Sequence, residues 1–159
     1  MNTSFLFPNR FKILGWVLFV PSFVFGIVAR VLPLDFENYL NLKVFAIYEQ
    51  GLFSKSIFFG FIENGFLDEI LLSFLIIGSI LIGFSKLKVE DEFIAKIRYE
   101  SLVWATYFNF GMLLFTTLFI FGGAYFDVMI LNVFSMLFFF IIRFHYMIFK
   151  LQKSEKDDE

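Results

Sequence analysis

The chain has 159 residues, of which 59% are hydrophobic and 28 are phenylalanine, and its mean hydropathy is +0.79. A soluble domain uses about 45–50% apolar residues, so a soluble chain of this composition would leave a large apolar surface facing water. The net charge of −2 gives no reason to expect nucleic acid as a partner, and the absence of cysteine excludes disulfides, thiol nucleophiles and cysteine-ligated metal centres. We therefore expect an integral membrane protein whose main partner is the lipid bilayer.

Four apolar blocks are expected to cross the bilayer as helices, at residues 13–29, 66–84, 102–121 and 128–148. A hydrocarbon core of about 30 Å requires roughly 20 helical residues, and about 17 suffice. Helices are favoured because four segments are too few for a closed barrel, and because the backbone must satisfy its own hydrogen bonds in lipid. The predicted fold class is thus an all-α integral membrane protein with four transmembrane helices.

The first block could be mistaken for a signal peptide, because basic residues precede it. We expect a retained helix instead, since Arg30 follows the apolar run directly and no small-residue cleavage pattern precedes the polar loop. Pro21 lies near the middle of this block and should kink the helix, because proline removes one backbone donor.

The outer loop at residues 30–65 separates the first two blocks. Within it, "LKVFAIYEQ" and "SIFFGFIEN" are rich in β-branched and aromatic residues and predict a small β-hairpin over residues 42–64. An isolated hairpin is only marginally stable, so this one should lean on the membrane surface or on the helix ends. The alternative is an interfacial amphipathic helix, with these side chains dipping into lipid: Phe45, Ile47, Phe53, Phe58 and Phe61. A ligand-sensing role would reside in this loop.

The segment at residues 85–101, "SKLKVEDEFIAKIRYES", is strongly charged and lies between the second and third blocks. Its apolar residues recur at helical spacing, which predicts an amphipathic cytoplasmic helix leading into the third span. The acids Glu90, Asp91 and Glu92 should form a solvated helix start, because neighbouring helical side chains point about 100° apart and cannot converge on one metal ion. The basic residues expected to contact lipid headgroups or a protein partner are Lys86, Lys88, Lys96 and Arg98.

The interiors of the third and fourth spans carry a few uncharged polar residues. Those expected to form interhelical polar contacts are Asn109, Thr116, Asn132 and Ser135. If "GGAYFD" forms the turn between the two spans, Thr116 and Ser135 reach similar depth and should hydrogen-bond. The functional alternative is a polar pocket for a small ligand.

The distribution of basic residues predicts the orientation. With both termini cytoplasmic, ten of the 13 Lys and Arg residues lie inside, and only Arg30, Lys43 and Lys55 lie outside. Residues 149–159 then form a cytoplasmic tail. The acids Asp68 and Glu69 fall at the outer end of the second helix, where the helix dipole favours negative charge.

Four stretches in this order, "PNRFKILGWVLFVPS", "LKVFAIYEQ", "FFGFIENGFLDEI" and "FSKLKVEDEFIAKIRYESLVWATYFNF", carry a resemblance that covers most of the chain. The sequence resembles a group of small bacterial membrane proteins of uncharacterised function. The resemblance implies a four-helix, multi-pass protein of the bacterial inner membrane, and it brings no catalytic residues to carry over.

The sequence contains no motif for phosphate binding, zinc proteolysis or serine hydrolysis, and His145 is its single histidine. We therefore expect a non-enzymatic protein without cofactor or metal. One hypothesis is a regulatory, sensory or scaffold component whose segment 85–101 and tail contact a cytoplasmic or membrane protein partner. The other is a small carrier or channel for an uncharged or weakly polar solute, acting as a homo-oligomer.

Overall fold

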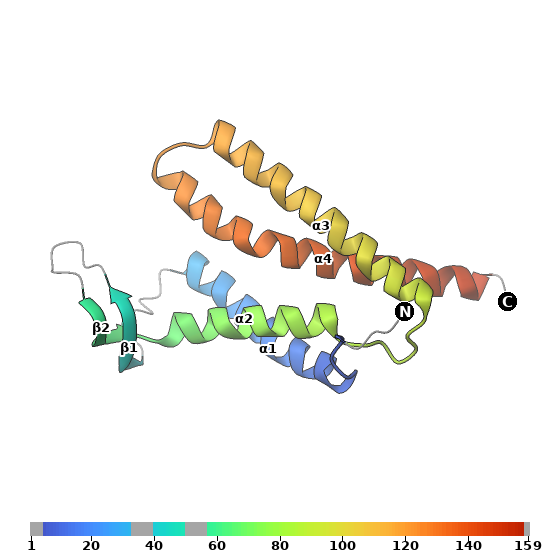
Figure 1. Ribbon diagram of the computed structural model, residues 1–159, viewed down its shortest axis with the longest axis horizontal. Coiled ribbons are helices and arrows are strands. Elements are labelled where there is room, and N and C mark those ends of the chain that lie inside the picture. Colours follow the sequence, from blue (N-terminus) through green and yellow to red (C-terminus); the bar gives the residue numbers. More distant parts are fainter. Residues whose placement is uncertain (1–4, 33–39, 50–56, 158–159) are drawn as a thin grey trace. The chain divides into compact units, whose positions relative to one another are not determined.

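Figure 1 shows the computed structural model of the chain, which describes residues 5–32, 40–49 and 57–157. The described residues are mostly helical, and they include a small antiparallel hairpin. The elements in chain order are α1 (Arg10–Val31), β1 (Asn41–Glu49), β2 (Ile57–Gly65), α2 (Leu67–Phe84), α3 (Glu92–Phe119) and α4 (Gly123–Asp157). Within this part of the chain, four helices are long and apolar enough to cross a membrane, as the sequence predicts.

The helices are apolar on their outer surfaces. Along α3, Tyr107, Phe110, Leu114 and Leu118 all remain exposed, although a soluble protein rarely exposes a continuous apolar stripe. Helix α1 continues through Pro21, and the hydroxyl of Ser22 donates to the carbonyl of Leu18 at 2.8 Å. Such surfaces fit a hydrocarbon environment better than water.

The chain divides into two compact units. The first comprises Met1–Trp16 and Gly78–Glu159, and the second comprises Val17–Ile77. The second unit contains the hairpin, in which β1 pairs antiparallel with β2 from Asn41 opposite Gly65 to Glu49 opposite Ile57. The hairpin interpretation of residues 42–64 is therefore confirmed over the alternative of an interfacial helix. Its connection at residues 50–56, which includes Phe53, lies outside the described residues.

Two contacts tie the hairpin to the start of α2, which lies in the same unit. The side-chain amide of Asn64 donates to Glu69 Oε1 at 2.6 Å, and the amide of Phe66 donates to the carbonyl of Leu40 at 3.2 Å. Asp68 and Glu69 both lie in the first turn of α2, where the helix dipole favours acids.

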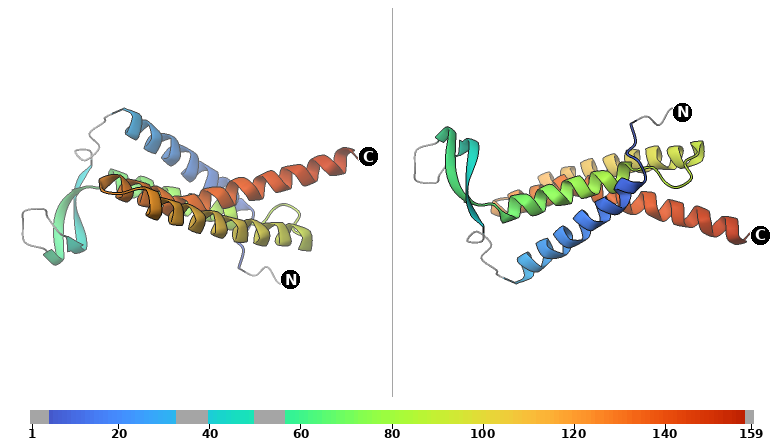
Figure 2. Two further views of the ribbon diagram at one scale, coloured as in Figure 1. Left: turned by 90° about the horizontal axis from the view of Figure 1, so that it is seen from above. Right: turned by 90° about the horizontal axis from the view of Figure 1, so that it is seen from below.

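In the first unit, α3 and α4 run antiparallel and lie side by side in all views (Figures 1 and 2). The turn between them is short. Helix α3 ends at Phe119, with the amide of Ile120 donating to the carbonyl of Thr116 at 2.9 Å, and Gly122 adopts a φ of 73° that favours glycine. Helix α4 begins at Gly123, so the prediction that "GGAYFD" forms the turn is wrong.

Both helices extend beyond the predicted spans. Helix α3 has 28 residues and begins within the charged segment, at Glu92. Helix α4 has 35 residues and continues through most of the predicted tail, to Asp157. Lys and Glu are good helix formers, so the helix does not have to end where the apolar composition ends.

The core of the first unit lies where α2, α3 and α4 approach the connection between α2 and α3. Ile82, Phe140 and Phe144 are fully buried, and a Cβ on Gly83 would come within 2.5 Å of the Phe140 ring. A glycine is therefore required at position 83 for this close approach of α2 to α4.

Candidate functional site at the junction between α2 and α3

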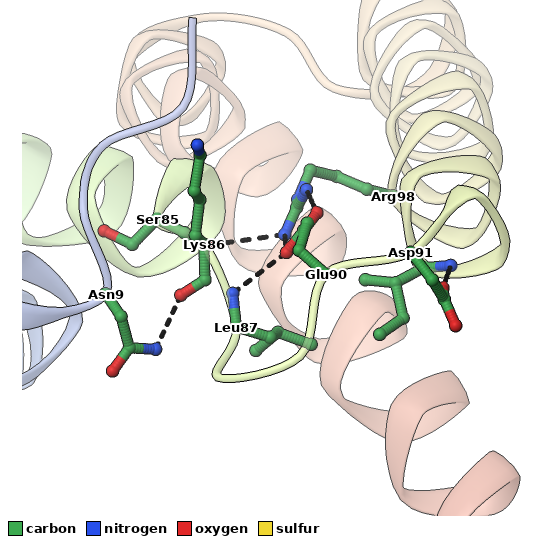
Figure 3. Close-up of polar contacts among 8 residues, drawn as sticks. Asn9, Ser85, Lys86, Leu87, Glu90, Asp91 and Arg98 are labelled. Carbon is green, nitrogen blue, oxygen red and sulfur yellow. Dashed lines mark hydrogen bonds and ion pairs between the residues drawn. The ribbon is translucent and has the colours of Figure 1, made fainter. Parts of the chain in front are cut away.

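The connection between α2 and α3 comprises residues 85–91, which we call the junction loop. The N-terminal segment, residues 7–9, forms main-chain hydrogen bonds with the first residues of the junction loop and with the last residue of α2. The amide of Phe7 donates to the carbonyl of Phe84 at 3.0 Å, and the amide of Lys86 donates to the carbonyl of Phe7 at 2.9 Å. The side-chain amide of Asn9 donates to the carbonyl of Lys86 at 2.7 Å (Figure 3). These bonds fix the end of α2 against the start of the chain.

A buried ion pair closes the junction loop from the other side. The guanidinium of Arg98 pairs with Glu90, and the two side chains are only 6% and 11% exposed. Nη2 of Arg98 donates to Glu90 Oε2 at 3.2 Å and to the carbonyl of Ser85 at 3.3 Å. Glu90 Oε2 also accepts from the amide of Leu87 at 2.9 Å (Figure 3). One arginine thus connects α3 to both ends of the junction loop.

Helix α3 begins with a side-chain cap. Asp91 has extended backbone angles, φ −115° and ψ 179°, and its Oδ1 accepts from the amide of Ile94 at 2.7 Å. This arrangement satisfies one of the free amides at the helix start. The predicted helix start at Asp91 and Glu92 agrees with these bounds, but the prediction that Glu90 is solvated is wrong, because its side chain is only 11% exposed.

One aromatic ring, that of Phe144, lies against the ion pair. The Arg98 guanidinium carbon lies 4.8 Å from the centroid of the Phe144 ring, a distance suited to a cation–π interaction. Arg98 Nε and Ser85 Oγ are buried without a hydrogen-bond partner among the described residues. The ring of Phe144 therefore contributes to stabilising a cation that is largely removed from water.

A second arginine connects α3 to α4. Nη1 of Arg143 donates to the Ser101 hydroxyl at 3.0 Å, and its guanidinium carbon lies 5.6 Å from the Trp104 ring centroid. His145 lies two residues further along α4, and its ring centroid is 5.5 Å from that of Phe144 and 5.8 Å from that of Trp16. His145 Nδ1 lies 2.9 Å from the carbonyl of Ile141.

The predicted contact residues of the charged segment separate into two groups. Lys88 and Lys96 are exposed and Lys86 is half-buried, with its side chain directed away from the ion pair in Figure 3. Lys96 forms an exposed ion pair with Glu100 at 4.0 Å. Arg98 differs from the lysines, because its side chain is only 6% exposed and its guanidinium pairs with Glu90.

A signal for Arg98 was present in the sequence. Ile94, Ser101 and Ala105 are buried along one stripe of α3, and Arg98 falls on the same stripe at helical spacing. An arginine on a buried stripe requires an anion nearby. No local spacing rule identifies Glu90 as that anion, because the ion pair crosses from the helix into the non-helical junction loop.

Three of the four predicted interhelical polar residues come together. Ser135 Oγ lies 2.7 Å from Asn109 Oδ1 and 3.2 Å from Asn132 Oδ1. Thr116 is buried elsewhere, and its hydroxyl donates to the carbonyl of Leu113 at 2.9 Å. The predicted Thr116–Ser135 bond is wrong because α4 begins earlier than expected, which places Asn109, about two turns earlier in α3, opposite Ser135.

The junction combines a buried ion pair, a helix cap and main-chain pairing. In the parts of the chain that the structure describes, no group of three His, Asp or Glu side chains could hold a metal ion. Comparison with protein-family models, curated proteins and solved structures finds no match for this chain.

Proposed function

We propose that this chain is a non-enzymatic scaffold or regulatory protein of the bacterial inner membrane, with four transmembrane helices and both termini in the cytoplasm. In this proposal, the exposed lysines beside the junction loop bind an acidic surface of a cytoplasmic protein. The bias of basic residues toward the termini and the junction supports this orientation.

The single observation that carries the proposal is that the junction loop is held on both sides while Lys88 on the loop and Lys96 in the adjoining turn of α3 stay exposed. Main-chain pairing with the N-terminal segment holds one side, and the Glu90–Arg98 ion pair holds the other. A loop used only as a connection needs no such buried ion pair, whose charges are costly to remove from water. Loops fixed by a rigid scaffold commonly carry binding functions.

The charges beside the loop suggest the chemistry of the partner. Lys88 is exposed on the loop, and the side chain of Lys96 is 70% exposed one turn into α3. Two lysines at fixed positions can complement carboxylates on a partner surface, and such complementarity contributes mainly to specificity and association rate.

The alternative of a carrier or channel has less support. Its candidate polar residues, Asn109, Asn132 and Ser135, hydrogen-bond with one another between α3 and α4. Polar residues that satisfy one another in this way commonly hold membrane helices together.

Photo-crosslinking in cells tests the proposed docking surface. A photoreactive residue at Glu92, exposed between the two lysines, should yield a defined adduct that disappears in the double variant Lys88→Ser/Lys96→Ser. The matched control is Lys43→Ser, because Lys43 is comparably exposed, at 77%, and also forms an exposed ion pair. An adduct that persists without Lys88 and Lys96 would contradict docking through these lysines.

A further inference from the structure

One face of the hairpin, which we call the aromatic face, comprises Phe45, Ile47, Phe59 and Phe61. These side chains are 57–74% exposed. Side chains alternate across a strand, so the cross-strand register places Phe45, Ile47 and Phe61 on the same side. Phe59 lies on this side as well, because the centroid of the Phe45 ring is 6.5 Å from that of Phe59 and 5.6 Å from that of Phe61.

Phe59 is held in a backbone conformation that phenylalanine rarely adopts. Its φ is 52°, and regular pairing is interrupted there, between the Ala46–Gly60 and Tyr48–Phe58 pairs. Backbone strain of this kind persists where the surroundings favour it, and it is concentrated in functional segments. Here the strained residue adds one more exposed ring to the aromatic face.

The base of the hairpin is fixed at the start of a candidate membrane span. Strand β2 ends at Gly65 and α2 begins at Leu67, and the Asn64–Glu69 bond connects the two elements. At about 3.3 Å per residue, Phe61 lies within about 20 Å of the first residue of α2. A hairpin attached in this way stays close to the membrane boundary.

We infer that the aromatic face is a membrane-surface anchor, whose rings lie at the boundary between headgroups and acyl chains of the bilayer that α2 enters. The inference rests on the proposed membrane insertion of the helices, and it is independent of the docking role of Lys88 and Lys96.

The composition of the aromatic face favours lipid over a protein partner. Protein interfaces are enriched in Phe as well as in Tyr, Trp and Arg, but they also include about one hydrogen bond per 100–200 Å², and the four side chains of the aromatic face carry no hydrogen-bonding group. Polar groups lie at its two ends, the exposed Lys43–Glu63 ion pair near the base and Glu49 at the other end of β1. An apolar centre with charged ends fits a surface that meets acyl chains in the middle and headgroups around them.

Fluorescence quenching by lipids tests the anchor, since the chain has no cysteine and accepts a single probe. An environment-sensitive fluorophore is attached in Ile47→Cys, or in the matched control Tyr48→Cys, whose side chain points to the opposite face. The full chain is placed in phosphatidylcholine–phosphatidylglycerol vesicles with quenchers on the acyl chains. We expect several-fold stronger quenching at position 47, and equal quenching at both positions would overturn the inference.

A reference probe separates this inference from the proposed membrane insertion. Leu114→Cys lies on the exposed face of α3 and reports on the helices alone. Quenching at 114 without quenching at 47 would overturn the anchor and leave membrane insertion intact. Absence of quenching at 114 would overturn both. A probe at 47 that is shielded from water but not quenched by lipid would show that protein covers the aromatic face, which also overturns the inference.

A substitution on the aromatic face checks that its apolar character is responsible. Phe61→Ser should reduce the quenching at position 47, and Phe61→Leu should retain it. Because Phe61→Ser could unfold the hairpin, a second pair of cysteines, Lys43→Cys and Glu63→Cys, tests whether the strands still pair, since these residues lie opposite each other. Loss of quenching in a hairpin that still forms this disulfide supports the anchor, and undiminished quenching contradicts it.

Discussion

Glu90 and Arg98 form an ion pair between the junction loop and the second turn of α3, although neither side chain is more than 11% exposed. The same guanidinium donates to the carbonyl of Ser85 and lies over the ring of Phe144. One side chain therefore connects the end of α2, the junction loop, α3 and α4. The positions of the exposed lysines beside the loop depend on this connection.

Removing either partner of the ion pair should strongly destabilise the first unit. Glu90→Gln or Arg98→Met leaves an unpaired or unsatisfied buried group, which costs about 3–5 kcal/mol in known buried pairs. The free energy of unfolding in mixed micelles measures the loss. The double variant Glu90→Gln/Arg98→Met should recover part of it, because no charge then remains buried without its partner.

The control for the ion pair is Lys96→Met, which removes the exposed Lys96–Glu100 pair in the same helix. An exposed i, i+4 pair contributes about 0.3–0.5 kcal/mol, so this variant should unfold almost like the unmodified chain. If Lys96→Met and Arg98→Met reduced the free energy of unfolding equally, the Glu90–Arg98 pair would contribute no more to stability than an exposed pair.

The helix cap at Asp91 should make a smaller contribution. Asp91→Ala leaves the amide of Ile94 without its acceptor, and such changes cost about 0.5–2 kcal/mol. Asp91→Asn keeps an oxygen acceptor and should retain most of the stability. Unfolding in mixed micelles distinguishes the two variants, and an Asp91→Ala variant as stable as Asp91→Asn would argue against the cap.

The approach of α2 to α4 predicts that Gly83 does not tolerate a side chain. A Cβ at position 83 would lie 2.5 Å from the buried ring of Phe140, and overpacking of this kind typically costs about 1–3 kcal/mol. Gly111→Ala is the matched control, because no atom lies within 4 Å of its added Cβ. Alanine should stabilise the helix at position 111 by up to about 1 kcal/mol. Two variants of equal stability would contradict this packing.

The polar cluster between α3 and α4 should contribute modestly to stability. Ser135→Ala removes the hydroxyl near Asn109, and polar contacts between membrane helices contribute about 0.6 kcal/mol on average. Thr106→Ala serves as control, because the Thr106 hydroxyl donates to the carbonyl of Leu102 within its own helix. A change in solute flux in reconstituted vesicles, with stability unaltered, would favour the carrier hypothesis over an interhelical role.

The helices and the hairpin follow from the sequence because their signals are local. Apolar runs of sufficient length identify the helices, and two short aromatic runs identify the strands. The apolar spans alone do not give the start of α3 or the end of α4, because a change from apolar to polar composition marks a change of solvent and not the end of a helix. A cap such as Asp91 is a better marker of a helix end.

The candidate site was only partly predictable. The exposed lysines were identified from charge alone, but the Glu90–Arg98 pair depends on how the junction loop bends back on α3. The pairing of Phe7 with the end of α2 uses main-chain groups. Because almost every residue carries these groups, residue types in the sequence do not predict the pairing.

The most direct test of the account is the topology of the chain in whole cells. Single cysteines at Lys43, Lys88 and Ser154, each at an exposed position, are treated with a membrane-impermeant thiol reagent. We predict labelling at position 43 alone in intact cells, and at all three positions after the membrane is permeabilised. Labelling at position 88 or 154 in intact cells would place the exposed lysines outside the cytoplasm and contradict the proposed docking function.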